Sequence, residues 1–325
     1  MSGSDTSQRS GSATILAEDA KVLDATRTLR WPARRIVAAG FPGAHRSRAL
    51  GSASEVVELR AYRQGDELRR LDWKVLARTD RPFIRLAPEH AVAATSIIVD
   101  ATGSQAFPAP LLDKWRTTRQ LTLALMAAAQ RAGDPVGVTI VPGSPERPRL
   151  LAPRTRRGLV DDAARLFASV TPTGDAPLAP AMRTASRRTS VGATIITRLV
   201  VVSDMLGDLD AMLGVARELA SAGCELTAVH VVHPRELDPP SRATLWVDPE
   251  GGGDERSMPP VARERYLSVF ADWRNRLARS WRRLGAYYVE AVTAVPSAEH
   301  VRRVVGGTSA SAAPRGTAVT NRSRP

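Results

Sequence analysis

Cysteine, lysine and aromatic residues are scarce in this 325-residue chain, and each shortage narrows the range of functions. The single cysteine, Cys224, excludes an intramolecular disulfide and a zinc ribbon, which needs several thiolates. Lys21, Lys74 and Lys114 are the only lysines among 46 basic residues, so the net charge of +13 comes from arginine. Aromatic residues make up 5% of the chain, and none interleave with the arginine-rich patches at 147–157 and 183–198 as base-stacking residues would. Nucleic-acid binding is therefore disfavoured, although an arginine-rich nucleic-acid-binding protein stays an alternative.

No apolar stretch in the sequence is long enough to cross a bilayer. The longest, residues 121–129, falls far short of the roughly 20 residues that a spanning helix needs. Arg34 and Arg35 precede only a few apolar residues before Pro42, which does not support a signal peptide. We therefore expect a cytoplasmic protein without membrane insertion, whose 43% hydrophobic residues are ample for a buried core.

Composition divides the chain into four parts. Residues 1–14 and 306–325 are rich in small and polar residues and cannot bury enough apolar surface to offset the entropy of ordering, so we expect disordered tails. Residues 15–92 contain an amino-terminal helix and then a β-rich extension in which acidic and basic residues nearly cancel. Residues 93–305 form a larger domain.

Within the extension, alternating polarity over residues 55–62 predicts a strand, and residues 81–86 predict another.

Strands and helices alternate after residue 92. Short β-branched runs typical of buried parallel strands lie at 95–100, 136–141, 199–203, 226–232 and 287–292. Helices are expected at 111–132, 157–169, 178–188, 209–222, 260–284 and 298–305. In the helix after Pro260, the aromatic stripe through Tyr266, Phe270, Trp273 and Trp281 predicts a core face. This alternation predicts an α/β fold with a doubly wound, mostly parallel sheet.

Oxygen-bearing side chains follow two of the predicted strands. Asp100, Thr102 and Ser104 occupy alternate positions of one loop, and Asp204 follows the strand that ends at residue 203. If the strand order reverses beside the first strand, both loops face one crevice. Such hard oxygens suit Mg²⁺ or Mn²⁺. The alternative is that the two aspartates only cap the helices that follow them.

The loop at Asp100 resembles the metal-ion-dependent adhesion site of von Willebrand factor type A domains, Asp-x-Ser-x-Ser, with Thr102 in place of the first serine. The region before this loop resembles the signature of the family called domain of unknown function 58. The residues that carry this second resemblance are His45, Ser47, Arg60, Tyr62, Gly65, Asp66, Arg69, Asp72, Trp73 and Arg78. The similarity covers nearly all of the chain expected to be ordered. Because no transmembrane helix is expected ahead of the signature, the chain resembles the soluble branch of the family.

The resemblance implies a von Willebrand factor type A-like domain with a cation site on Asp100, Thr102, Ser104 and Asp204. One position departs from the family pattern, because Ala176 stands where the pattern supplies a further hydroxyl ligand. We therefore expect Mg²⁺ or Mn²⁺ to bind weakly. Members of the family are usually encoded beside MoxR-type AAA+ ATPases, so the resemblance also implies such an ATPase as partner, with an unknown client.

No nucleophile elbow, phosphate loop or assisted general base accompanies the signature residues, which predicts a non-enzymatic interaction module. A metal-dependent hydrolase is the alternative. The signature residues are expected to be structural: Asp72 would pair with an arginine such as Arg69 or Arg78, and Trp73 would be the apolar anchor that docks the extension onto the larger domain. Arginines that could meet an acidic partner surface are Arg183, Arg187 and Arg188.

Overall fold

The computed structural model describes residues 17–33, 58–62, 71–86, 92–187, 194–240, 245–246, 256–257 and 259–311. These residues fall into two compact units. The first contains residues 17–33 and nearly all of the described chain from Ala93 onward. The second contains residues 58–62 and 71–86.

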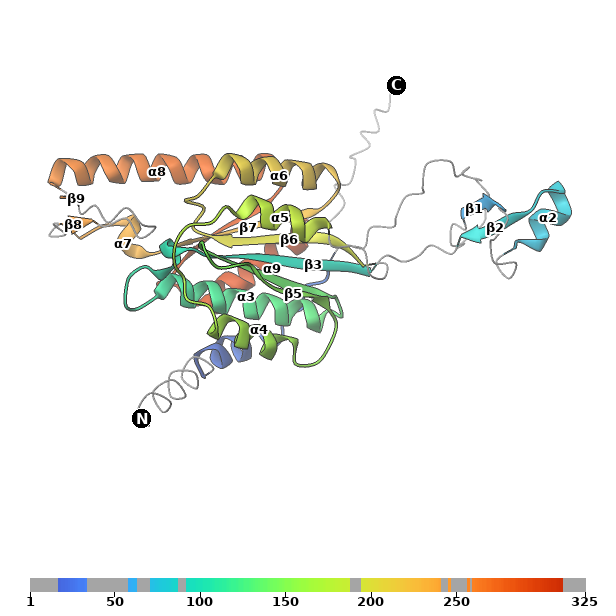
Figure 1. Ribbon diagram of the computed structural model, residues 1–325, viewed down its shortest axis with the longest axis horizontal. Coiled ribbons are helices and arrows are strands. Elements are labelled where there is room, and N and C mark those ends of the chain that lie inside the picture. Colours follow the sequence, from blue (N-terminus) through green and yellow to red (C-terminus); the bar gives the residue numbers. More distant parts are fainter. Residues whose placement is uncertain are drawn as a thin grey trace, which may run out of the picture. The chain divides into compact units, whose positions relative to one another are not determined.

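A six-stranded sheet forms the centre of the first unit (Figure 1). In spatial order its strands are β10 (Tyr287–Val292), β7 (Glu225–Val232), β6 (Thr194–Ser203), β3 (Val92–Ala101), β4 (Val136–Pro142) and β5 (Arg149–Arg154). The pairs β10–β7, β7–β6 and β3–β4 are parallel, whereas β5 runs antiparallel to β4 at the edge. The chain thus winds outward from β3 first to one side and then to the other. This is the predicted doubly wound, mostly parallel sheet.

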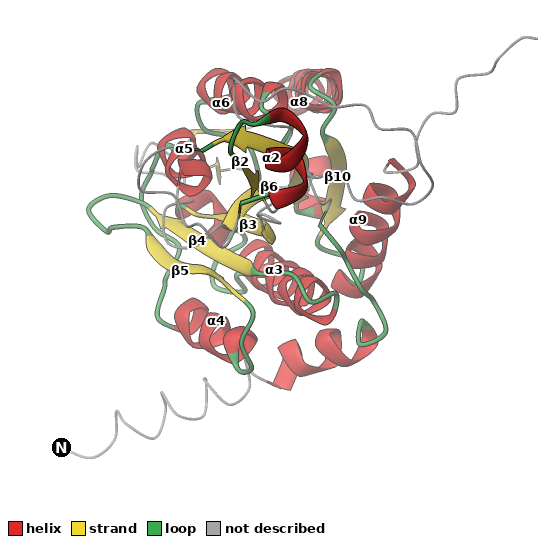
Figure 2. Ribbon diagram, turned by 90° about the vertical axis from the view of Figure 1, so that its right-hand side faces the viewer, coloured by secondary structure: helices red, strands yellow, loops and turns green. Residues whose placement is uncertain are grey.

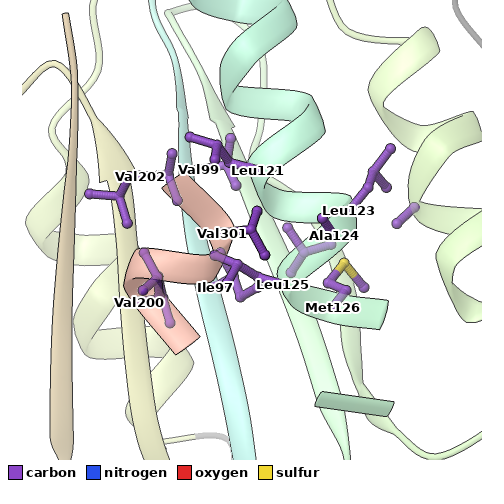
Figure 3. Close-up of a cluster of buried hydrophobic side chains, with 14 of the residues drawn as sticks. Ile97, Val99, Leu121, Leu123, Ala124, Leu125, Met126, Val200, Val202 and Val301 are labelled. Atoms are coloured by element: carbon purple, nitrogen blue, oxygen red, sulfur yellow. The ribbon is translucent and has the colours of Figure 1, made fainter. Parts of the chain in front are cut away.

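Helices cover both faces of this sheet (Figures 1 and 2). One layer contains α3 (Asp113–Arg131), α4 (Leu159–Ala168) and α9 (Ser297–Ser311), and the other contains α5 (Leu178–Arg187), α6 (Leu209–Ser221) and α8 (Pro260–Arg283). Successive side chains of β3 alternate between the layers, as the period of two in a strand requires. Ile97 and Val99 pack against the α3 side, as Figure 3 shows, and Ile98 packs on the α5 side.

The predicted strands and helices of this unit are present, and several unpredicted elements join them. These are the edge strand β5, the short helix α7 (Pro234–Leu237) and the two-stranded pair β8 (Leu245–Trp246) with β9 (Arg256–Ser257). The predicted aromatic stripe of α8 is only partly a core face. Leu277 and Trp281 are fully buried, whereas Tyr266 and Phe270 are half-buried and stack on each other at the end of the helix that lies near α7.

The amino-terminal helix, residues 17–25, packs on the α/β unit, so the predicted region 15–92 is divided between the two units. The reason is a buried ion pair, in which Arg119 Nε of α3 donates to both carboxylate oxygens of Asp19 at 3.0 and 2.9 Å. At the other terminus, α9 continues to Ser311, past the predicted end at residue 305. Residues 306–311 of the predicted tail 306–325 thus belong to this helix, whereas the rest of that tail and the predicted tail 1–14 lie outside the described residues.

The second unit contains the two strands that the sequence predicts, β1 (Glu58–Ala61) and β2 (Phe83–Leu86), and they pair antiparallel. Between them lies an unpredicted helix, α2 (Trp73–Thr79). Asp72 begins it, because its Oδ1 accepts a hydrogen bond from the backbone N–H of Val75 at 3.1 Å. Asp72 is buried and Trp73 is 66% exposed. The docking of the extension onto the larger domain through Trp73 stays a prediction.

Candidate functional site

Three neighbouring parallel strands bring their carboxyl ends to one edge of the sheet. The strands β7, β6 and β3 are adjacent, and the loops that leave them begin near Val232, Ser203 and Ala101. Ligands of open α/β sheets bind outside such carboxyl ends, where the strand order reverses. The fold therefore brings Asp100 and Asp204 to the same edge, as the sequence predicts.

The loop after β3 forms a compact cluster of oxygen atoms. Thr102 donates to Asp100 Oδ1 twice, from its backbone N–H at 2.9 Å and from its hydroxyl at 2.7 Å. The Thr102 hydroxyl also lies 3.1 Å from Ser104 Oγ. All three side chains are buried. The structure therefore brings together Asp100, Thr102 and Ser104, three of the four predicted ligands.

The end of β6 contributes a residue outside the predicted set of ligands. Ser203 Oγ donates to Asp100 Oδ2 at 2.6 Å, and Ser203 Oγ itself accepts a hydrogen bond from the backbone N–H of Met205 at 2.8 Å. Both carboxylate oxygens of Asp100 thus accept hydrogen bonds from neighbouring loops. These bonds fix the orientation of the carboxylate.

Asp204, the fourth predicted ligand, is paired with a lysine. Lys114 Nζ, at the start of α3, donates to Asp204 Oδ2 at 2.6 Å and to Glu236 Oε1 at 2.9 Å. The Lys114 and Asp204 side chains are almost inaccessible to solvent, with exposed fractions of 0% and 3%. Asp204 therefore has a positive partner within the protein.

Burial and neighbouring charges shift the protonation of these groups in opposite directions. Burial raises the pKa of Asp100 to about 7, and the negative charge of Asp204 adds to the rise. Burial also acts against the ionised form of Asp204, but the charge of Lys114 and hydrogen bonds from Lys114 and Ser104 outweigh it, so its pKa is lowered. Asp204 and Glu236 likewise outweigh burial at Lys114 and raise its pKa.

A small cavity of about 10 Å³ opens beside the Asp100 cluster. Its walls are formed by Asp100, Thr102, Asp175, Ala176, Leu178, Gly207, Asp208 and Met212. This volume is about that of a single water-sized probe. Ala176, which stands in place of the expected hydroxyl, is among the residues that line it.

The donor set at this cavity fits a divalent cation only in part. Three aspartates, Asp100, Asp175 and Asp208, line it together with Thr102, and such hard oxygens are the kind that Mg²⁺ and Mn²⁺ prefer. Asp208 Oδ1 is already used, because it accepts the backbone N–H of Ala211 at 2.9 Å. Ala176 offers no donor, and one oxygen of Asp204 is taken by Lys114. Among the residues that the structure describes, no group of three or more His, Cys, Asp or Glu side chains is placed to hold a metal. Of the four predicted ligands, a cation here would depend on Asp100, Thr102 and Ser104.

The other predicted residues are not gathered at this edge by any described contact. Arg183 is exposed and pairs with Glu218 of α6 at 3.3 Å. The side chains of Arg60 and Arg187 are not described, and His45, Ser47, Gly65, Asp66, Arg69 and Arg188 lie outside the described residues. Tyr62 donates its backbone N–H to Pro82 O at 2.9 Å. The proposed pairing of Asp72 with Arg69 or Arg78 and the arginine partner surface stay predictions.

Lys114 and Glu236 are the main members of this site that sequence reasoning missed. Their positions are 122 residues apart, and no local pattern joins them. One signal was available, because Lys114 is one of three lysines in a chain whose other basic residues are arginines. A lysine ammonium is a compact point charge, whereas a guanidinium is a wide planar fork, so a lysine in an arginine-rich chain indicates a position where the smaller cation is needed.

No helix within the described ranges combines the length and apolar character that a membrane crossing requires.

Comparison with known proteins places this chain among relatives of unknown function. It is 29% identical over 281 residues to uncharacterized protein Rv1480 of Mycobacterium tuberculosis (strain ATCC 25618 / H37Rv) and to uncharacterized protein Mb1516 of Mycobacterium bovis (strain ATCC BAA-935 / AF2122/97). Each alignment covers 83% of this chain and 84% of the relative.

Similar solved structures include the conserved hypothetical protein BatB from Bacteroides thetaiotaomicron and the von Willebrand factor type A domain of SpRpn10. BatB has a TM-score of 0.45 and 15% identity, over 68% of this chain and 98% of that chain. The SpRpn10 domain has a TM-score of 0.40 and 11% identity, over 65% and 95%. Residues 58–274 match the family described as protein of unknown function DUF58. The chain belongs to this DUF58 family.

Proposed function

We propose that this protein is a non-enzymatic protein–protein interaction module that binds its partner at the carboxyl edge of the sheet. The observation that carries the proposal is the convergence of Asp100, Thr102 and Ser104 in one hydrogen-bonded cluster beside a small cavity. The predicted resemblance to type A domains supports the same use of this edge. The cluster contains no activated nucleophile, which favours binding over catalysis.

The proposal includes a divalent cation, Mg²⁺ or Mn²⁺, on Asp100, Thr102 and Ser104. One protein carboxylate leaves the cation with net positive charge, so an acidic side chain of the partner would complete its coordination. Ala176 supplies no oxygen, and we therefore expect millimolar rather than micromolar affinity. The cation would make the partner contact strong at one point, and the surrounding surface would supply specificity.

The proposed partner is a MoxR-type AAA+ ATPase, and the setting is the cytoplasm. The support for this partner is the resemblance of the sequence to the DUF58 signature, whose members are usually encoded beside such ATPases. The ATPase would supply nucleotide hydrolysis, and this chain would act as its adaptor in assembling or remodelling a client complex.

A pull-down with a co-encoded MoxR-type ATPase tests the proposal. We expect recovery of the ATPase in millimolar Mg²⁺, loss of recovery with EDTA, and weakened recovery with Asp100→Asn, which keeps the size of the side chain but removes its charge. Asp161→Asn is the matched control, because Asp161 lies exposed on α4. Equal recovery with and without EDTA would contradict the cation. Absence of ATPase with co-purification of nucleic acid would favour the nucleic-acid alternative, and phosphoester turnover would favour the hydrolase.

A further inference from the structure

We propose that Lys114 is a resident cation of this edge, which neutralises Asp204 and excludes it from the divalent site. This inference rests on the proposed function, because it states which residues of the site a divalent ion can use. It replaces the predicted set of four ligands by Asp100, Thr102 and Ser104 alone.

The contacts of Lys114 show a counter-ion bound on two sides. Its ammonium lies 2.6 Å from Asp204 Oδ2 and 2.9 Å from Glu236 Oε1, and the lysine has no exposed surface. Two of its three N–H donors are thus used on carboxylates. A buried ammonium without partners would be costly, so both carboxylates stabilise it in this position.

The backbone holds Lys114 in this position independently of its side chain. Lys114 is the second residue of α3, and its backbone N–H donates to Phe107 O at 3.1 Å, within the loop that leaves β3. Glu236 lies in α7 after β7, and its second oxygen accepts the backbone N–H of His233 at 2.6 Å. Lys114 therefore links the loops that follow β3, β6 and β7.

This arrangement sets two conditions on a divalent ion. Asp204 Oδ2 can reach a metal only if the ammonium withdraws, and Asp204 Oδ1 accepts the backbone N–H of Leu206 at 3.4 Å. A dication next to an ammonium is also repelled by it. The cavity beside the cluster is lined by Asp100 and Thr102, and its lining residues include neither Asp204 nor Ser104. A cation at the Asp100 cluster can thus bind while the Lys114–Asp204 pair stays intact.

Removal of the ammonium should convert a weak site into a stronger one. In Lys114→Met, Asp204 and Glu236 lose their positive partner, and the edge gains net negative charge. Mn²⁺ binding, measured by electron paramagnetic resonance of the free ion, should show an affinity at least tenfold higher in Lys114→Met than in the wild type. Lys21→Met is the matched control, because Lys21 is exposed on the amino-terminal helix, and its affinity should equal that of the wild type.

The variant Asp204→Asn tests the same inference if Lys114→Met does not fold. Asp204→Asn leaves Glu236 as the partner of Lys114, and it should bind Mn²⁺ within about twofold of the wild type. The double variant Lys114→Met/Asp204→Asn should lose most of the tenfold gain, a coupling that a double-mutant cycle measures. Circular dichroism confirms the fold of each variant before titration.

The outcomes separate this inference from the proposed function. Equal Mn²⁺ affinities of wild type and Lys114→Met would overturn the role of Lys114 and leave the cation site in place. A tenfold loss in Asp204→Asn would also overturn it, because Asp204 would then be a ligand. No Mn²⁺ binding by any variant would overturn both this inference and the cation in the proposed function.

Discussion

The guanidinium of Arg198 lies 4.0 Å from the centroid of the Trp31 ring. The same guanidinium donates to the backbone oxygens of Trp31 at 3.1 Å and Pro32 at 2.6 Å. The side chains of Arg198 and Trp31 are both buried. Arg198 belongs to β6, so this contact fastens the amino-terminal segment to the central sheet. The cation–π geometry and the hydrogen bonds act together at one residue.

Trp31→Ala should destabilise the α/β unit by about 3–5 kcal/mol, because it removes a fully buried indole and the face on which Arg198 stacks. Urea unfolding followed by circular dichroism measures the change. Trp73→Ala is the control of equal size, and since Trp73 is 66% exposed it should cost less than about 1 kcal/mol. Equal effects of the two substitutions would contradict the described packing.

Asp72 offers a test of its capping role in the second unit. Asp72→Ala removes the acceptor for the Val75 N–H and should cost about 0.5–2 kcal/mol of local stability. Asp72→Asn retains an acceptor and should be close to the wild type. Limited proteolysis within residues 71–86 measures both variants. If Asp72→Asn is cleaved as fast as Asp72→Ala, the charge of Asp72 matters more than its cap, which would favour the predicted arginine pair.

His230 should make stability depend on pH. Its Nδ1 lies 2.7 Å from the Tyr288 hydroxyl, and burial lowers its pKa to about 3. The charged or titratable groups around it are Asp204, Lys114, Arg274, Tyr288 and Glu290. Because the unfolded chain binds a proton near pH 6.5 and the folded one only near pH 3, this contribution to stability is lost as pH falls between these values.

His230→Gln removes the titrating ring and should flatten this dependence. Between about pH 6 and 4 the wild type should lose up to about 1.4 kcal/mol per pH unit relative to the variant, the linkage slope for one proton. Chemical denaturation at several pH values provides the two curves. Parallel curves would contradict the lowered pKa, because they would show that His230 binds as many protons in the folded as in the unfolded state.

Mg²⁺ should raise the melting temperature of the wild type, because a ligand that binds only the folded state stabilises it. At about ten times the dissociation constant the gain is about 1.4 kcal/mol. Asp100→Asn should abolish the gain, and Ala176→Thr should increase it by adding a hydroxyl to the wall of the cavity. Differential scanning fluorimetry with Mg²⁺ and with matched NaCl separates this effect from ionic strength. A gain retained in Asp100→Asn would place the cation elsewhere.

The pattern of the chain predicts most of the sheet, because its parallel strands are buried apolar runs between amphipathic helices. The edge strand β5 was missed, since it carries arginine at both ends and Pro153 within, features that central strands avoid. The helix α2 was missed because a seven-residue helix has little periodicity to detect. Short or exposed elements gain their structure from their neighbours.

The residues of the candidate site likewise divide into those that a local pattern predicts and those that only the tertiary structure brings together. Asp100, Thr102 and Ser104 lie within one loop, so their spacing alone predicts that they meet. The partner of Asp204 comes from a helix 90 positions earlier in the chain, and its contact depends on how three loops pack. Local patterns predict donors in a loop, whereas the counter-ion of a buried carboxylate depends on tertiary structure.

Anomalous scattering from a crystal soaked in millimolar Mn²⁺ locates the cation and its ligands. We expect a manganese peak within about 2.5 Å of oxygens of Asp100, Thr102 and Ser104, with the Lys114–Asp204 pair intact. No peak at the carboxyl edge of the sheet would contradict the cation site. A peak bound directly by Asp204, with Lys114 displaced, would contradict the role of that lysine as the resident counter-ion.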